Sequence, residues 1–253
     1  MVSSLRAYEY WLTVYRRVWR GTIFSSFLNP VLYLSALGVG LGKLVNQGAH
    51  PLGIPYIDFV APGMLAAIGM QVSAIEASFP VRGAIRWNRQ YHAMLATPLR
   101  VRDLVAGHLM YVATRVAVAG AIYLAVLAAF GTVHSPLGVL AWPAVVLIGL
   151  AFAAPISALS AWAENEVFNP LFRFAITPMF LFSGTFFPIS RLPHGLRELA
   201  YATPLWHGVD LVRRLTLGTA TLGLSLVHVA YLVALVCAGV VLARRAYAGR
   251  LVT

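Results

Sequence analysis

The sequence contains six long runs of predominantly apolar residues, separated by short polar segments. The runs cover residues 22–43, 57–80, 104–131, 137–163, 168–188 and 222–243. A helix needs roughly 20 apolar residues to cross the hydrocarbon core of a bilayer, and each run reaches about that length. Only 11% of the residues are charged, compared with about 25% in soluble domains. We therefore predict an all-α integral membrane protein with six transmembrane helices, formed by a single domain over residues 1–253.

Positive charges are concentrated in segments that lie on one side of the membrane if the N-terminus is inside. These segments are residues 1–20, 82–103 and 244–250. The positive-inside rule therefore places both termini in the cytoplasm. The same topology explains the formal net charge of +11, because the arginines flank apolar runs where anionic headgroups meet them. We expect membrane lipids as partners and no nucleic acid.

Residues 4–20 have the pattern of an amphipathic helix. One helical stripe is apolar and the opposite stripe is basic. The apolar stripe consists of Leu5, Tyr8, Leu12, Tyr15 and Trp19. Such a helix lies in the headgroup plane or packs on the protein itself, so we predict an interfacial connecting helix at the cytoplasmic face.

Residues 82–97, in the most polar part of the chain, predict a short cytoplasmic helix with two stripes. Arg82, Arg86 and Arg89 share one stripe, and Pro98 ends the pattern. The other stripe is apolar and consists of Trp87, Tyr91, Met94 and Leu95. A helix of this kind either docks into the groove of a partner or lies flat on the membrane.

Residues 189–216 carry leucine and valine at helical intervals but are too polar to span the membrane. We predict two short outer helices between spans five and six, joined near Thr203 and Pro204, that enter or cap the outer leaflet. His207 and His228 lack an acidic or histidine partner at ligand spacing, so they are interpreted as ordinary side chains.

Two ionisable side chains lie within the predicted spans. An ionisable group deep in a bilayer costs at least about 2.5 kcal/mol, so Glu76 and Arg115 should face protein or water. Their heights allow Arg115 to reach Glu76. His108, Tyr111 and Arg115 share one helix face, which indicates either the lining of a substrate path or a polar clamp between helices. Arg173 has Glu164 and Glu166 as nearby candidate partners.

The sequence lacks the motifs of common active sites. The segment around Gly42 and Lys43 fails as a phosphate loop, because positions 37 and 44 are leucine where glycine and a hydroxyl residue are required. Neither a zinc-protease helix nor a serine-hydrolase elbow is present. We predict no enzymatic activity, no metal and no cofactor on this chain, which favours transport or scaffolding.

Five segments together resemble the type 2 ABC exporter permeases, in particular the branch of nodulation lipo-oligosaccharide and daunorubicin-type export permeases. In order along the chain they are NPVLYLSALGVGLG at 29–42, YIDFVAPGMLAAIGM at 56–70, W-x6-MLATPLR at 87–100, FLFSGTFFPISRLP at 180–193 and TPLWHGVDLVRRLTLG at 203–218.

This resemblance implies a six-span subunit that dimerises in the bacterial plasma membrane and works with two separate ATPase subunits, which bind ATP and magnesium. It implies that residues 82–97 form a coupling helix and that residues 189–216 form an outer gate. The residues expected to couple to the ATPase are Arg86, Trp87, Arg89, Tyr91, Met94 and Leu95. The resemblance also implies an amphiphilic cargo, such as a lipid-linked saccharide, a lipid or a hydrophobic drug.

The family resemblance does not fix the substrate path, for which we select residues by position. Glu76, Tyr111 and Arg115 lie near the inner leaflet, and Phe182, Phe186 and Phe187 lie near the outer exit. Packing or lipid contact is the alternative role for the three phenylalanines. At the level of the whole protein, the alternatives are a proton-coupled transporter using Glu76, an enzyme acting on lipid-linked sugars, and a membrane scaffold.

Overall fold

The computed structural model describes residues 2–47, 53–163 and 167–252, and over these ranges it is helical and contains no β-strand. The predicted all-α class is thus confirmed. The first half of the chain contains α1 (Val2–Leu34), η1 (Ser35–Leu41), α2 (Gly42–Asn46), α3 (Tyr56–Ala77), α4 (Phe79–Arg82), η2 (Gly83–Trp87), α5 (Gln90–Leu95) and α6 (Val101–Ala129). The second half contains η3 (Pro136–Leu140), α7 (Ala141–Trp162), α8 (Phe168–Pro170), η5 (Leu171–Ile176), α9 (Thr177–Phe182), η6 (Ile189–Arg191), α10 (His194–Tyr201), α11 (Pro204–Leu217) and α12 (Leu222–Leu251).

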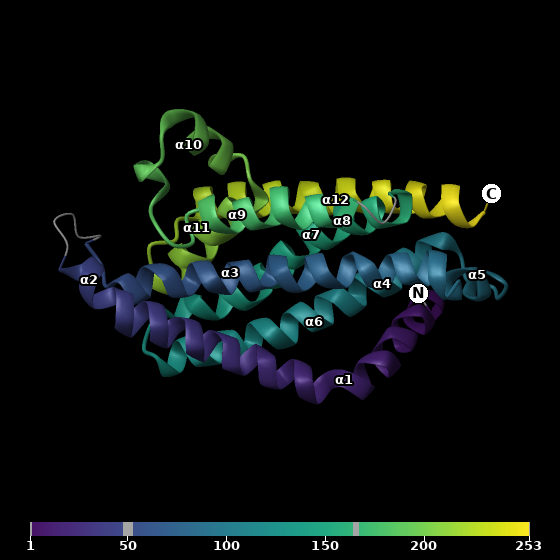
Figure 1. The fold of residues 1–253 in the computed structure, drawn as a ribbon, viewed down its shortest axis with the longest axis horizontal. Helices are drawn as coiled ribbons and strands as arrows, with labels where there is room; N and C mark the ends of the chain where they lie inside the picture. Colours follow the sequence, from purple (N-terminus) through teal and green to yellow (C-terminus); the bar gives the residue numbers. More distant parts are fainter. Residues whose placement is uncertain (1, 48–52, 164–166, 253) are drawn as a thin grey trace.

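The helices form an elongated bundle. Helices α1, α3, α6, α7, α12 and the stretch from α8 to α9 run along its long axis, and both termini lie at the same end as α5 (Figure 1). Helix α7 is central, because it packs against α3, α6, α11 and α12. Small residues permit the close approaches: a Cβ atom on Gly239 of α12 would lie 2.7 Å from the backbone of Pro155 in α7.

Four helical stretches are long and apolar enough to cross a membrane, and they comprise Tyr56–Trp87, Val101–Ala129, Pro136–Trp162 and Leu222–Leu251. These stretches correspond to the second, third, fourth and sixth predicted spans. The first and fifth predicted spans are not among the four. The fifth run is helical only over 168–182, with Arg173 inside it, and is therefore shorter than the roughly 20 residues a span requires.

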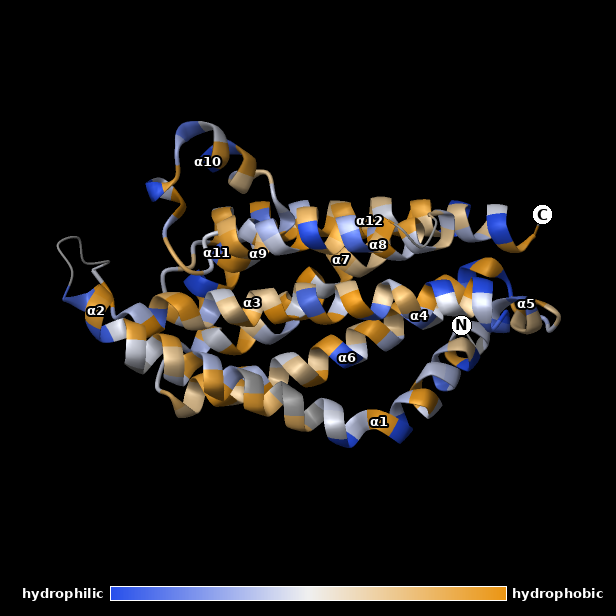
Figure 2. Cartoon of the chain, in the orientation of Figure 1, coloured by the Kyte–Doolittle hydropathy of each residue, from blue (hydrophilic) through white to orange (hydrophobic). Residues whose placement is uncertain are grey.

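Hydrophobic residues cover the middle of the long helices. Hydrophilic patches lie near α5, on α10 and at the bend of α1 (Figure 2). This banding is typical of a protein whose long axis follows the membrane normal.

Helix α1 differs from the predicted short interfacial helix followed by a separate span, because it is continuous from Val2 to Leu34 and bends partway (Figure 1). Its N-terminal half packs against α6 through Ala7 and Trp11, which are buried. Leu5 and Trp19 of the predicted apolar stripe are exposed instead. Tyr8 and Tyr15 of the same stripe pack against the core, so packing on the protein, one of the two predicted alternatives, holds for part of the stripe.

The predicted continuous helix over residues 82–97 is also interrupted. Residues 79–87 continue the line of α3, and α5 begins only at Gln90. Arg89 causes the break, because its backbone has a left-handed φ of 49°. Arg82 does not share an exposed stripe with Arg86 and Arg89; it is buried and donates a hydrogen bond to the carbonyl of Ala163.

The segment after α9 contains the two expected short helices, α10 and α11. They are joined where predicted, and the Thr203 hydroxyl caps α11 by accepting a hydrogen bond from the Trp206 amide at 3.3 Å. Helix α11 is more than a surface cap, because Leu205, Val209 and Val212 are fully buried. It packs against α3 and α7, whereas α10 stands away from the bundle (Figure 1).

Candidate functional site

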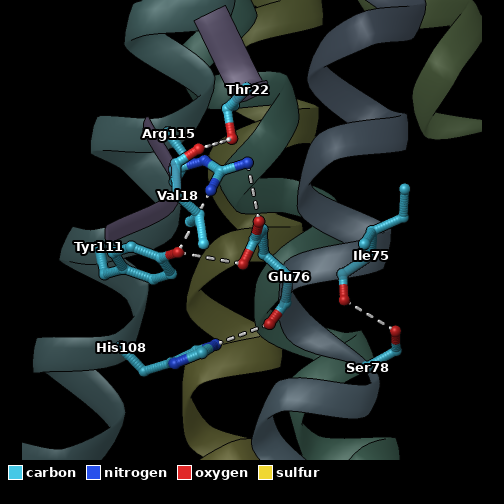
Figure 3. Close-up of polar contacts among 8 residues, drawn as sticks. All are labelled: Val18, Thr22, Ile75, Glu76, Ser78, His108, Tyr111 and Arg115. Atoms are coloured by element: carbon cyan, nitrogen blue, oxygen red, sulfur yellow. Dashed lines mark hydrogen bonds and ion pairs between the residues drawn. The ribbon is translucent and has the colours of Figure 1, made fainter. Parts of the chain in front are cut away.

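An ion pair joins α3 and α6 near the end of the bundle that carries α5. The Arg115 guanidinium lies 3.0 Å from Oε1 of Glu76, and the Tyr111 hydroxyl donates a hydrogen bond to Oε2 of Glu76 at 3.2 Å (Figure 3). Both charged side chains are largely buried, with 12% of Arg115 and 13% of Glu76 exposed. The predicted pairing of Arg115 with Glu76 is therefore confirmed.

His108 extends this polar face by one turn. Its Nε2 lies 3.1 Å from the carbonyl oxygen of Glu76. A proline has no N–H, so Pro80 leaves this carbonyl without the donor that a continuous helix would provide. Because a carbonyl oxygen only accepts, His108 must donate from Nε2. The imidazole thus satisfies a buried backbone group at the break between α3 and α4.

Helix α1 covers the ion pair from the side. The Trp11 ring stacks on Tyr111 with centroids 5.5 Å apart, and the Arg115 guanidinium lies 4.6 Å from the centre of the Tyr15 ring. Further along α1, the Ser4 hydroxyl donates to Asp103 at 2.9 Å. These contacts connect α1, α3 and α6 at one point. The arrangement is that of an interhelix clamp, with the carboxylate committed to two partners.

The sequence interpretation missed the role of Trp11. The residue was left out of the apolar stripe although it lies three positions after Tyr8 and four before Tyr15. Its ring also meets His108 edge to face, with centroids 4.8 Å apart. The i, i+4, i+8 series of Ala7, Trp11 and Tyr15 was the available signal.

The element between the second and third predicted spans contains both exposed and buried side chains. Tyr91 of α5 is buried, and its ring lies 6.3 Å from Trp11 of α1 and 5.7 Å from Tyr247 of α12. Burial raises the pKa of the Tyr91 phenol well above its usual value. Tyr91 therefore joins α5 to two long helices and is not open to a partner.

The other residues expected to couple to an ATPase are divided between surface and interior. Trp87 is 57% exposed, and Arg86 and Arg89 are exposed as well. Met94 and Leu95 are half-buried and pack on the core. Trp87, Arg86 and Arg89 are therefore accessible to a partner, whereas Met94 and Leu95 hold α5 on the core.

The three phenylalanines of the predicted outer path do not share one surface. Phe182 is exposed and lines an apolar cavity of about 300 Å³ between α9 and α10. Phe186 packs on the core and meets Phe180 edge to face at 5.0 Å. Phe187 meets Phe182 at 6.4 Å. Only Phe182 and Phe187 are brought together.

A second polar network lies at the opposite end, between α11 and α12. His228 Nε2 lies 3.0 Å from Oδ2 of Asp210, His228 Nδ1 lies 2.8 Å from Nδ1 of His207, and Arg214 lies 2.5 Å from Asp210. His207 and His228 therefore have buried polar partners that the sequence analysis did not find. Sequence spacing gave no signal, because His228 is on a different helix. The two imidazoles bond to each other, and no described group of three His, Cys, Asp or Glu residues is placed to hold a metal ion.

The candidate partners of Arg173, Glu164 and Glu166, lie outside the described residues. The Arg173 guanidinium lies 5.8 Å from the centre of the Phe174 ring.

Together these features define a multi-span helical membrane protein without a recognisable catalytic centre among its described residues. Comparison with known proteins specifies the class further. The chain matches the ABC-2 type transporter family over residues 9–217 and belongs to that family. It is thus the membrane permease component of an ABC-type transporter.

Several relatives carry the name nodulation protein J. The chain is 34% identical to the protein of Rhizobium leguminosarum bv. viciae over 216 residues, which cover 82% of each chain. It is 33% identical to the Rhizobium meliloti (strain 1021) protein over 242 residues, which cover 90% of this chain and 87% of the relative. The protein of Rhizobium leguminosarum bv. trifolii is 33% identical over 223 residues, covering 82% of this chain and 81% of the relative.

Proposed function

We propose that this chain forms the membrane-spanning part of an exporter driven by ATP, which a separate ATPase subunit hydrolyses with its bound magnesium. Its family and its similarity to nodulation protein J support this function. In this proposal two copies of the chain form a homodimer in the bacterial plasma membrane, and two ATPase subunits bind the cytoplasmic side. The proposal keeps six spans by counting α1 and, together with the residues that follow it to 188, the shorter stretch from α8 to α9, and it places both termini in the cytoplasm.

The observation that carries the proposal is the position of Tyr91. This ring connects α5, the element expected to meet the ATPase, to Trp11 of α1 and Tyr247 of α12. Because the three rings are buried and close-packed, a displacement of α5 must move α1 and α12 with it. In the proposed cycle, ATP binding displaces α5 and the long helices respond.

The surface proposed for the ATPase is the exposed part of the same element. Trp87 forms its apolar centre, flanked by Arg86 and Arg89. Tryptophan and arginine are enriched among the residues that dominate binding energy at protein interfaces. Met94 and Leu95 contribute indirectly, because they fix α5 on the core.

The proposed cargo is an amphiphile, such as a lipid-linked saccharide, a lipid or a hydrophobic drug. Its path begins near Glu76, Tyr111 and Arg115 and leaves near Phe182, Phe186 and Phe187, with residues 189–216 acting as the outer gate. The buried ion pair orders the inner end of this path, and the apolar cavity at Phe182 suits an acyl or aromatic group.

The proton-coupled alternative is less well supported. A carboxyl group that carries protons needs to be free to gain and lose one, whereas Glu76 is bound to Arg115 and Tyr111. In membrane vesicles, Glu76→Gln should leave ATP-driven transport at least partly active at reduced temperature. Complete loss of transport by a variant that is folded and present at normal abundance would favour the proton mechanism.

The experiment that tests the proposal is a pull-down of the tagged chain from its native membrane in mild detergent, followed by an ATPase assay. We expect an ATPase of about equal abundance to copurify and Trp87→Ala to weaken its binding. Trp162→Ala is the matched control, because Trp162 is another exposed tryptophan at the end of a long helix. If the chain is isolated without an ATPase under conditions that keep other membrane complexes intact, the proposal is refuted.

A further inference from the structure

A cavity of about 380 Å³ lies between α5 and the end of α12. Arg86 belongs to η2 at its edge, Arg89 and His92 lie around α5, and Arg250 comes from α12. Ile85 is buried and forms the apolar part of the wall. Three guanidinium-bearing side chains from two distant parts of the sequence therefore surround one hollow.

The charge of this cavity is uncompensated within the described chain. None of its described lining residues is acidic, and neither Arg86 nor Arg89 has an ion-pair partner among the described residues. Two carboxylates near the start of α1 and of α6 have partners of their own: Glu9 pairs with Arg6, and Asp103 accepts hydrogen bonds from Ser4 and from the Arg100 amide. Positive side chains that line one cavity without a described counter-charge favour the binding of an anion there.

The backbone holds Arg89 at the cavity in a costly conformation. Among the described residues, Arg89 is the one non-glycine residue with a positive φ, which is 49°. Asparagine tolerates a left-handed backbone better than arginine does, yet Arg89 and not the adjacent Asn88 adopts it. Strain of this type persists where the surroundings or the function require it.

The cavity lies at the level where lipid headgroups are expected. Three of the four candidate spans end around it, at Trp87, Trp162 and Leu251. Trp162 is 69% exposed, and tryptophans at the ends of spans typically lie at the membrane–water interface. Arg250 is tied to this level, because its Nη2 donates to the Trp162 carbonyl at 2.8 Å.

We propose that this cavity binds the phosphate group of an anionic lipid headgroup from the cytoplasmic leaflet. Guanidinium groups bind phosphate oxygens through paired, charge-assisted hydrogen bonds, which matches the Arg86, Arg89 and Arg250 lining. The apolar part of the wall at Ile85 suits the glycerol region of the same lipid. The bound lipid would connect α5 to α12 at the surface, as Tyr91 does in the interior. This proposal does not depend on the ATPase.

The test uses the full-length chain purified in a neutral detergent and native mass spectrometry of retained lipid. Phosphatidic acid, phosphatidylglycerol and phosphatidylcholine are titrated separately, and inorganic phosphate is added as a competitor. We expect retention to be strongest for phosphatidic acid and weakest for phosphatidylcholine. Arg86→Gln and Arg250→Gln should each weaken the anionic lipid at least roughly tenfold. Arg245→Gln, an exposed arginine on α12 outside the cavity, is the matched control and should bind as the wild type does.

Arg89→Gly separates binding from folding. Glycine accepts positive φ without strain, so this variant should be at least as stable as the wild type and should still lose lipid binding. Equal retention of the three lipids, or retention unchanged in the three cavity variants, would overturn the proposal. Competition by millimolar inorganic phosphate as effective as that by the lipid would also overturn it, in favour of a free-anion site. If no lipid is retained but the cavity variants lose the ATPase, the cavity is a protein-binding site and the proposed function still stands.

Discussion

The clamp between Glu76 and Arg115 makes a quantitative prediction about stability. Glu76→Gln removes one charge and leaves the other in a site where 12% of the Arg115 side chain is exposed. Breaking a buried pair in this way costs about 3–5 kcal/mol, much more than the ~0–1 kcal/mol of a surface pair. Tyr15 and Tyr111 still contact the guanidinium, so we expect the lower end, about 3 kcal/mol.

The double variant Glu76→Gln with Arg115→Met distinguishes the energy of the ion pair from the cost of leaving one charge unpaired. It removes both charges and keeps similar volumes, so most of the stability lost in Glu76→Gln should return. The measurement is thermal unfolding in detergent followed by tryptophan fluorescence. By the scaling of soluble proteins, about 3 kcal/mol corresponds to a fall in Tm of roughly 6–12 °C. If Glu76→Gln unfolds like the wild type, the clamp is not structural and a role in the substrate path alone remains.

Two further predictions concern helix packing and acid stability. Gly107→Ala would place a Cβ 2.6 Å from Cβ of Ala7 and 2.9 Å from backbone atoms of α1, so it should lower the free energy of unfolding by about 1–3 kcal/mol, measured by thermal unfolding. Gly120→Ala on the same helix is the control, because its Cβ would meet a side chain at 3.2 Å and should cost less. Equal effects of the two substitutions would contradict the packing of α1 on α6. Burial alone raises the pKa of Asp210, but hydrogen bonds from His228 and Arg214 outweigh burial and hold this pKa below its usual range. The resulting stability is therefore present at neutral pH and lost as pH falls below about 4, and a Tm-versus-pH series should show a smaller acid loss for Asp210→Asn than for wild type.

The sequence predicted contacts best where the membrane left few choices. A buried carboxylate and a buried guanidinium on adjacent spans have almost no alternative partner in a bilayer, so the Glu76–Arg115 pair followed from position alone. Thr203 and Pro204 likewise marked the start of α11, because an N-cap followed by proline is a local signal.

Features set by tertiary packing were not predictable in the same way. The sequence left open whether lipid or protein covers the apolar stripe of α1, and it did not indicate that α6 covers the neighbouring face through Ala7 and Trp11. The break at Arg89 has no signal in residue type, because arginine is a good helix former. The contact of His207 with His228 depends on how α11 lies against α12.

Three stretches in the described chain, η1, η2 and η5, are π-helical, and this affects how the bundle can move. A π-helical turn bonds residue i to i+5 and contains one residue more than an α-helical turn. If such a turn reverts to i to i+4 bonding, the following residues advance by one position and rotate by about 100°, with no break in the helix. η2 is separated by two residues from α5, which begins at Gln90, so a one-residue slip there would turn the chain that follows, including α5, to a new direction while α3 stays in place. Such a slip would reorient α5, the element proposed to meet the ATPase, without breaking the helix that joins it to α3.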